Sequence, residues 1–159
     1  MRFYLDTEFI ERGAGYPISL ISIGIVAEDG RELYLVSSEF DPETASQWVK
    51  DNVLPHLDGE KTYVATIAEK IRTFVGADKP EFWGYYADYD WVVLCQLFGS
   101  MVRLPKGWPM YCRDIKQWCD SLGNPDLPVQ GKGEHNAIAD ARWNKTAYEF
   151  LRARAEGVA

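Results

Sequence analysis

Three short motifs carry side chains that could bind a divalent metal ion together. They are Asp6 with Glu8 two positions later, then Asp90, then His135 with Asp140 five positions later. Because alternate residues of a strand share a face, the first pair would project together, roughly 6–7 Å apart along the backbone. Two such carboxylates repel each other unless a cation lies between them, and oxygen ligands favour Mg²⁺ or Mn²⁺. An isolated Asp-x-Glu pair is more often an exposed strand end, so the metal hypothesis depends on the other two motifs.

Asp90 opens an apolar stretch that predicts a helix over residues 89–98. A carboxylate in the first turn of a helix is stabilised in its charged form by the helix dipole. Asp88 has the residue type that helices prefer as an N-cap. We therefore predict that Asp88 caps this helix and that Asp90 contributes to the site.

His135 follows the glycine-rich residues 131–134, and Asn136 is the predicted N-cap of a last helix over 137–156. This cap places Asp140 in the second turn of that helix. An imidazole on a flexible loop can take a proton from a metal-bound water near neutral pH, since its ordinary pKa is about 6.5. The alternative is a surface histidine close to an aspartate on a helix face, with no chemistry attached.

The composition indicates one globular domain. The chain has 159 residues, of which 47% are hydrophobic and 26% charged. Its net charge of −7 argues against a non-specific coat for nucleic acid and against a membrane-surface binder. The charge does not exclude an enzyme that holds a few nucleotides at a chain end through bound cations.

The three cysteines, Cys95, Cys112 and Cys119, lack the C-x2-C spacing of zinc sites. We interpret them as reduced thiols. With no signal-peptide pattern and no apolar run of membrane-spanning length, we expect a cytoplasmic protein that does not bind membranes.

Residue periodicity predicts an α/β domain, a central mixed β-sheet flanked by α-helices. The predicted strands cover residues 3–6, 18–27, 31–36 and 81–86, and the predicted helices cover 44–54, 62–75, 89–98, 114–122 and 137–156. The proline- and glycine-containing residues 124–133 are expected to form a loop. We expect the single domain to span 1–159, with about 155–159 as a disordered tail.

Taken together, the motifs resemble the DEDD superfamily of 3′–5′ exonucleases, which share a ribonuclease-H-like fold. Asp6 and Glu8 match its first motif, Asp90 its second and Asp140 its third. His135 fits the histidine subtype, because the position that carries tyrosine in the other subtype is Asn136 here.

Longer stretches, 4–11, 20–32, 39–43 and 89–97, are similar to the small polyadenylate-specific exoribonucleases of the RNase AS family. The resemblance covers residues 1 to about 154, and 55–80 and 119–133 match poorly. The asparagine that the superfamily often carries three or four residues before its second aspartate is absent, since Tyr86 and Ala87 stand there.

The resemblance implies phosphodiester hydrolysis with two Mg²⁺ ions, or Mn²⁺ ions, about 3.5–4 Å apart. The four carboxylates would bind the metals, and His135 would act as general base. Nucleoside 5′-monophosphates would leave the 3′ end of single-stranded RNA, with polyadenylate as the implied preference. The family also implies a homodimer.

Substrate contacts are expected from Thr7, Phe9 and Ser22. Phe9 is the first candidate to stack on a base, whereas Tyr89 and Trp91 are expected in the core because their helix is apolar nearly all round. Candidates for contact with the RNA backbone are Lys106, Arg113, Lys116 and Lys132.

Three other functions remain open at this point. The same chemistry could act on single-stranded DNA, because nothing in the motifs distinguishes a 2′-hydroxyl. A non-catalytic module that binds nucleic-acid ends is a second alternative, although none of the four carboxylates is missing. A hydrolase of small nucleotides would be distinguished by competition between mononucleotides and oligonucleotides.

Overall fold

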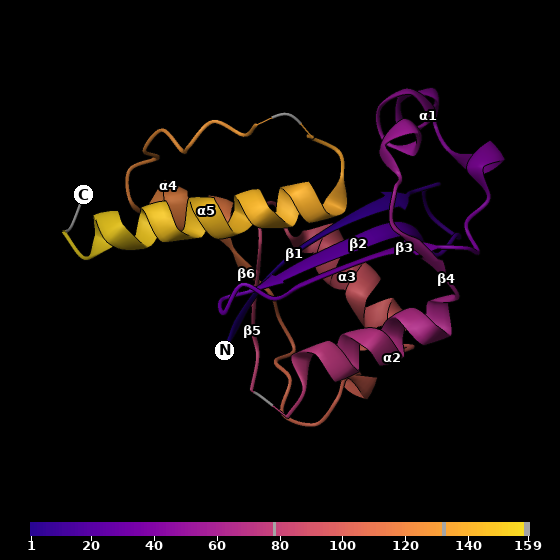
Figure 1. Ribbon diagram of the computed structural model, residues 1–159, viewed down its shortest axis with the longest axis horizontal. Coiled ribbons are helices and arrows are strands. Elements are labelled where there is room, and N and C mark those ends of the chain that lie inside the picture. Colours follow the sequence, from indigo (N-terminus) through magenta and orange to yellow (C-terminus); the bar gives the residue numbers. More distant parts are fainter. Residues whose placement is uncertain (78, 132, 158–159) are drawn as a thin grey trace.

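A six-stranded mixed sheet forms the centre of the computed structural model, which describes residues 1–77, 79–131 and 133–157 (Figure 1). From edge to edge its strands are β4 (Glu60–Thr62), β3 (Glu32–Ser37), β2 (Ser19–Ala27), β1 (Arg2–Ile10), β5 (Glu81–Gly84) and β6 (Arg113–Asp114). The first three strands form an antiparallel meander, and β4, β5 and β6 each run parallel to the strand they join. The predicted α/β domain with a central mixed sheet is confirmed.

Helices cover both faces of this sheet. The helices of the described residues are α1 (Gln47–Asn52), α2 (Val64–Val75), α3 (Asp88–Leu97), α4 (Ile115–Ser121) and α5 (Ala137–Ala155). Figure 1 shows α4 and α5 on one face and α2 and α3 on the other, with α1 beyond the end of β1. The first strand is therefore enclosed on both sides, and its alternate residues face two different cores.

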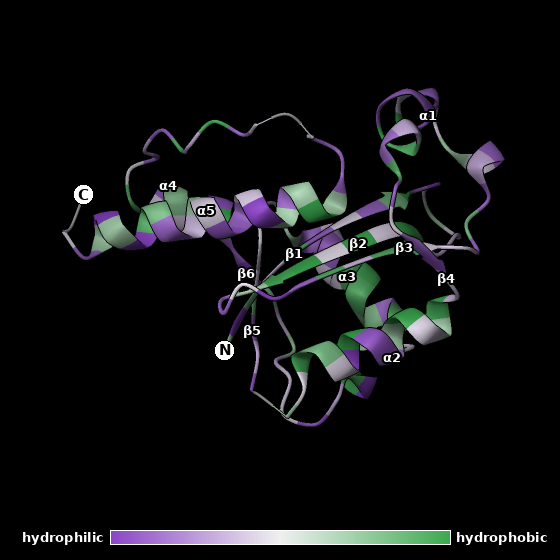
Figure 2. Ribbon diagram, in the orientation of Figure 1, coloured by the Kyte–Doolittle hydropathy of each residue, from purple (hydrophilic) through white to green (hydrophobic). Residues whose placement is uncertain are grey.

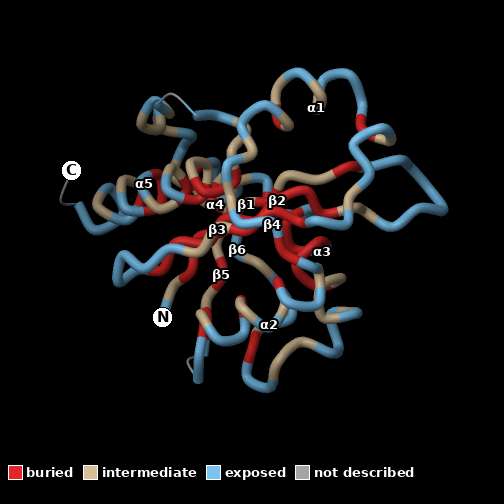
Figure 3. The backbone as a smooth tube through the Cα atoms, turned by 45° about the vertical axis from the view of Figure 1, so that its right-hand side comes forward, coloured by how far each residue is buried: buried red, intermediate tan, exposed pale blue. Residues whose placement is uncertain are grey.

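The larger core lies between the sheet and the pair α2 and α3, where Phe3 and Leu5 of β1 meet Ile71 and Leu94. The smaller core joins Tyr4 of β1 to side chains of α4 and α5. Figure 2 shows hydrophobic residues along β2 and α3, and Figure 3 shows the buried residues concentrated in the central strands. Most aromatic side chains take part in this packing.

A β-bulge interrupts the pairing of β1 with β2 next to Glu8. Glu8 pairs with Ser22, but Phe9 pairs with Leu20, so that one residue of β2 has no partner. The bulge rotates the end of β2, which places Leu20 in the same core as Ile23 although their positions differ by an odd number. Bulges are common next to active sites because they redirect side chains.

The structure corrects several predicted boundaries. The first strand continues to Ile10, so that Asp6 and Glu8 lie inside it. The helix predicted over 44–54 is divided into a 3₁₀ turn (Pro42–Thr44), α1 and a second 3₁₀ turn (Leu54–His56), because Ser46 caps a new helix and Pro55 cannot donate within one. The short strands β4 and β6 were not predicted.

The ends of the chain and its cysteines were also the subject of predictions. The last helix ends at Ala155, and residues 158–159 of the predicted tail lie outside the described residues. All three cysteines are free thiols. Within the described residues, no helix has both the length and the apolar character needed to cross a membrane.

Candidate functional site

Three of the predicted carboxylates meet at one place. Asp6 and Glu8 project from the same face of β1, and Asp140 projects from the first turn of α5, not from the second as predicted. One oxygen from each of the three side chains lies within 4.8 Å of the other two. All three side chains are partly buried. This spacing suits hard oxygen ligands around a divalent cation.

The close approach of α5 to the sheet depends on Gly24. This residue is the cross-strand partner of Asp6 on β2. A Cβ atom at position 24 would lie 2.2 Å from the backbone oxygen of Ala137, so that only glycine leaves room for the first turn of α5. One turn beyond Asp140, Asn144 donates from Nδ2 to the buried carbonyl oxygen of Leu5 at 2.9 Å. These two contacts fix Asp140 beside Asp6.

Burial and mutual repulsion disfavour the charged forms of the carboxylates in this cluster. Burial, and then the charges of the neighbouring acids, raise the pKa of Asp6 well above its ordinary value. Burial is also the main reason that the pKa of Glu8 rises to about 8, followed by the charges of Asp140 and Asp90. Close acidic groups of this kind cannot all ionise at neutral pH without a compensating positive charge. The donor set therefore fits a divalent metal ion.

Asp90 reaches the site from the opposite face of the sheet. Its Oδ1 accepts two hydrogen bonds from Thr7, from the backbone N–H at 2.8 Å and from the hydroxyl at 2.6 Å. Burial raises the pKa of Asp90 to about 6, and the two bonds from Thr7 oppose that rise. Asp90 is not part of the three-residue group, but the charge of Asp90 is the largest charge effect on Asp6.

The predicted cap of α3 is wrong. The N-cap position is Ala87, and Asp88 lies one residue further along, in the first turn, where no side chain caps the helix. The backbone N–H of Ala87 instead donates to Oδ2 of Asp114, at 2.8 Å, while Oδ1 of the same residue caps α4. Asp114 thus fixes the turn that carries Asp90.

Two of the loops that carry site residues contain strained backbone. Tyr86 has φ +54° and His135 has φ +66°, in the left-handed region that residues with a Cβ rarely adopt. Such conformations persist where the surrounding structure imposes them, and they are concentrated at functional sites. The first precedes Asp90 and the second precedes Asp140.

His135 lies at the edge of the carboxylate cluster. Its backbone N–H donates to Oδ2 of Asp140 at 3.0 Å, and the side-chain amide of Gln130 donates to Oδ1 of the same carboxylate. Burial raises the pKa of Asp140, and these two hydrogen bonds oppose that rise. The imidazole contacts the indole of Trp48 edge-on, with ring centroids 4.8 Å apart.

The three expected substrate-binding residues differ in how they can act. Phe9 stacks in parallel on Tyr89, with ring centroids 5.3 Å apart. The prediction that Tyr89 lies in the core is wrong, since it is 49% exposed, whereas Trp91 is buried as predicted. Thr7 is buried, and both its backbone N–H and its hydroxyl donate to Asp90. Ser22 lies in β2 and is fully buried.

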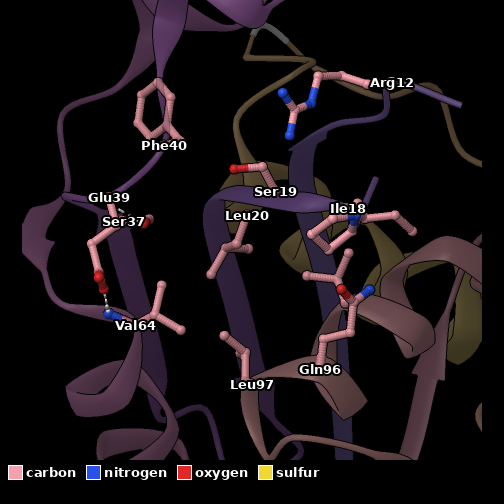
Figure 4. A pocket seen from close by; sticks show the side chains of 12 residues that line it. Arg12, Ile18, Ser19, Leu20, Ser37, Glu39, Phe40, Val64, Gln96 and Leu97 are labelled. Carbon is pink, nitrogen blue, oxygen red and sulfur yellow. Dashed lines mark hydrogen bonds between the residues drawn. The ribbon is translucent and has the colours of Figure 1, made fainter. Parts of the chain in front are cut away.

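A cavity of about 290 Å³ is lined by neighbours of this stacked pair, although neither ring lines it. Leu20, the cross-strand partner of Phe9, and Val93, one helical turn after Tyr89, both line it. Figure 4 shows the aliphatic side chains of Leu20 and Leu97 within the cavity. A second, smaller cavity of about 190 Å³ adjoins the carboxylates and is lined by Asp6, Tyr85, Gln130, Glu134, His135, Asp140, Trp143 and Asn144.

The polar side chains around the larger cavity include Arg12, whose guanidinium carbon lies 4.4 Å from the ring centroid of Tyr16. Arg12 makes no ion pair, and the side-chain amide of Gln96 makes no hydrogen bond, within the described part of the chain. The carboxylate of Glu39 is already used, because it accepts the backbone N–H of Val64 at 2.5 Å at the start of α2 (Figure 4). Within the described residues, the side-chain groups at this cavity without a hydrogen bond or ion pair are therefore the guanidinium of Arg12, the hydroxyl of Ser19 and the amide of Gln96.

Four basic residues were predicted to contact the RNA backbone, and two of them are engaged with acidic side chains. Arg113 lies 3.7 Å from Glu81, and Lys116 pairs with Asp120. Lys106 is exposed. Lys132 lies outside the described residues.

Sequence reasoning missed several residues of the site. Asn144 could have been identified, because it lies four positions after Asp140 and so shares its helix face. Trp48 and Tyr85 come from segments without a motif, and nothing in the sequence places them beside His135 and Asp140.

Solved structures with a similar fold are exonucleases. A zinc-bound complex of Escherichia coli ExoI with single-stranded DNA superposes with a TM-score of 0.64 at 12% identity, covering 98% of this chain and 40% of that one. Exonuclease I from Methylocaldum szegediense gives a TM-score of 0.62 at 16% identity, over 97% of this chain and 40% of its own. The chain thus spans about 40% of these proteins. The similarity shows that the fold is ribonuclease-H-like, as predicted.

Sequence comparison identifies relatives that are much more similar. The 3′–5′ exoribonuclease Rv2179c of Mycobacterium tuberculosis H37Rv is 44% identical over 149 residues, 89% of this chain and 88% of that protein. The same values hold for 3′–5′ exoribonuclease MT2234.1 of strain CDC 1551. Residues 1–151 also match the model of a protein family that is described as the 3′-5′ exoribonuclease Rv2179c-like domain. With Asp6 and Glu8 of the central strand β1 gathered beside Asp140 of α5, the chain belongs to the Rv2179c-like 3′–5′ exoribonuclease family.

Proposed function

We propose that this protein is a metal-dependent 3′–5′ exoribonuclease of the DEDD histidine subtype, equivalent to RNase AS, which releases nucleoside 5′-monophosphates from single-stranded RNA. The observation that carries the proposal is the group formed by Asp6, Glu8 and Asp140, whose oxygens lie within 4.8 Å of one another. Their burial and raised pKa values make a bound cation the simplest source of compensation.

The four carboxylates would hold two Mg²⁺ or Mn²⁺ ions. Asp6, Glu8 and Asp140 offer converging oxygens, and Asp90 offers Oδ2 while Thr7 holds its Oδ1. When bound, the ions would supply a lowered pKa for the attacking water and neutralisation of charge on the phosphate and the leaving oxygen.

The chain's own contribution to the proton transfer is His135. Its imidazole would take the proton of the attacking water as general base. The backbone N–H of the same residue holds Asp140 at 3.0 Å, which couples the position of the base to that of a metal ligand. General bases of this type contribute about 10²–10⁴-fold to the rate.

The stacked pair of Phe9 and Tyr89 would hold the last base of the RNA. The exposed face of Tyr89 offers a stacking surface, and such a contact contributes about 1–3 kcal/mol per base. The cavity lined by Leu20 and Val93, with the amide of Gln96 and the guanidinium of Arg12 in its wall, would accept a base edge and a phosphate. A single base-sized cavity with an amide is consistent with a preference for one base, which we propose to be adenine.

Two further properties stay predictions that follow from the resemblance, a homodimeric state and a cytoplasmic location. Single-stranded DNA remains the alternative substrate. It is supported by the structural likeness to ExoI, whose complexes contain single-stranded DNA and a dA16 oligonucleotide.

The experiment that tests the proposal uses 5′-labelled oligoadenylate, an oligocytidylate of the same length and the matched DNA. Each is incubated with Mg²⁺, with Mn²⁺ and with EDTA. We expect a ladder that shortens from the 3′ end of oligoadenylate in either metal and no shortening in EDTA. Asp6→Asn should lose at least about 100-fold in rate, whereas Asp126→Asn, an exposed aspartate outside the site, should not.

Equal shortening of DNA would replace the RNA proposal by the DNA alternative. Equal shortening of oligocytidylate would remove the adenine preference. Shortening that persists in EDTA, or that Asp6→Asn leaves unchanged, would show that the carboxylates do not carry the reaction.

A further inference from the structure

The imidazole of His135 has one specific neighbour, the indole of Trp48. Within the described residues the His135 ring makes no hydrogen bond, although a histidine in an active site is usually oriented by one. The two rings instead meet edge-on, with centroids 4.8 Å apart and an angle of 78° between their planes. The hydrogen bond to Asp140 holds the backbone of His135 but leaves the rotation of its ring free.

Trp48 is presented by a helix that is itself anchored. The hydroxyl of Ser46 accepts the backbone N–H of Val49 at 3.3 Å and so caps α1. Val49 and Val53 pack with Ile10 at the end of β1. The indole itself is 53% exposed, so that it contributes little to the core.

A second contact joins the same two segments. Nδ2 of Asn136 donates to the carbonyl oxygen of His56 at 2.9 Å and to the hydroxyl of Tyr34 at 3.2 Å. The segment 46–58 therefore contacts the loop at position 135 and again at position 136. Two adjacent contacts limit both the place of the backbone and the rotation of the imidazole.

We propose that Trp48 is a positioning residue, which orients the His135 imidazole toward the carboxylate cluster and acts on the reaction only through that ring. The inference rests on the proposed function, because it takes His135 as the general base. No other aromatic contact to His135 exists in the described residues. An error of about 1 Å in the placement of a catalytic group can cost about 100-fold in rate.

Kinetics of the intact protein on oligoadenylate test the proposal. Trp48→Ala should lower kcat about 10–100-fold and change KM by less than about twofold, since the ground-state contacts to RNA remain. Trp48→Phe should restore most of kcat, because it keeps an aromatic edge. Tyr111→Ala removes an aromatic ring of similar exposure, 55%, and should have no effect.

The decisive step is the double variant with His135→Ala. If Trp48 acts through the imidazole, Trp48→Ala has no further effect once that imidazole is absent. If its effect persists in the His135→Ala background, or if it mainly raises KM, the indole contacts the RNA directly and the proposal is overturned.

A readout without substrate separates this proposal from the proposed function. The chain has two histidines, so that the ring signals of His56 and His135 can be assigned by NMR from single variants. Trp48→Ala should shift and broaden the His135 ring signals and leave those of His56 in place. If they shift but the wild type cleaves no RNA, the contact stands and the proposed function fails. If the His135 signals do not change, the positioning role is overturned whatever the activity.

Discussion

Removing the charge of Glu8 should stabilise the metal-free protein. Burial and neighbouring acids raise the pKa of Glu8 from 4.5 to about 8. Between these two values the folded protein keeps a proton that the unfolded chain releases, so this residue's contribution to stability falls as pH rises through that window. At 1.36 kcal/mol per pKa unit, the full difference corresponds to ~5 kcal/mol.

Glu8→Gln removes this penalty because its amide carries no charge at any pH. Water at the mouth of the site screens part of the effect, so we expect a gain of about 2–4 kcal/mol at about pH 8.5 in EDTA. At about pH 4.5, where the carboxyl of the folded wild type is protonated, the gain should vanish. Urea unfolding followed by tryptophan fluorescence at both pH values measures the two differences.

With Mg²⁺ present, the wild type should become more stable than Glu8→Gln. At about pH 8.5 saturating Mg²⁺ should raise the stability of the wild type by mass action, and it should raise that of Glu8→Gln much less. Glu43→Gln, which alters an exposed side chain, should change stability by less than about 0.5 kcal/mol under every condition. The reasoning is refuted if Glu8→Gln unfolds at the same urea concentration as the wild type in EDTA at about pH 8.5, or at a lower one.

Three further substitutions test the structure around the cluster. Gly24→Ala should cost about 1–3 kcal/mol in unfolding free energy by pushing α5 off the sheet, and should weaken Mg²⁺ binding measured by calorimetry. Thr7→Val removes the hydroxyl that donates to Asp90, so the pKa of Asp90 should rise above about 6 when followed by NMR in EDTA. Asn144→Ala leaves a buried carbonyl of β1 without its donor and should cost about 1–3 kcal/mol in urea unfolding.

Control variants accompany the substitutions at Gly24 and Thr7. Gly131→Ala, where an added Cβ meets nothing within 4 Å, should leave stability unchanged. Thr7→Ser keeps the hydroxyl and should keep the pKa of Asp90 near that of the wild type. Equal Mg²⁺ affinity in Gly24→Ala and the wild type would show that the place of α5 does not control the metal ligands.

The convergence of the acidic residues could be predicted because it depends on local rules. Strand alternation puts Asp6 and Glu8 on one face, and the cap at Asn136 starts α5 at the right residue to present Asp140. Whether these residues bind metal stays a prediction, since that depends on an ion and not on the fold. The central mixed sheet could be predicted from the hydrophobic periodicity of the strands and helices.

The features that could not be predicted depend on tertiary contacts. Tyr89 is exposed and stacks on Phe9 at the far end of β1, and the apolar pattern of its own helix carries no sign of that contact. The contact of Trp48 with His135 likewise joins two residues that are far apart in the sequence. Asp88 was the reasonable cap by residue type, but Asp114 holds that turn from another strand.

The contact between Gly24 and Ala137 has a consequence for the order of folding. It joins parts of the chain that are far apart in sequence, and contacts of that kind form late because a long loop must close first. The meander of β1, β2 and β3 can form from neighbouring residues, yet Asp6 and Glu8 lack the carboxylate of Asp140 until α5 docks on the glycine. The three-carboxylate group proposed to bind metal would therefore be complete only once the last helix has docked on the sheet.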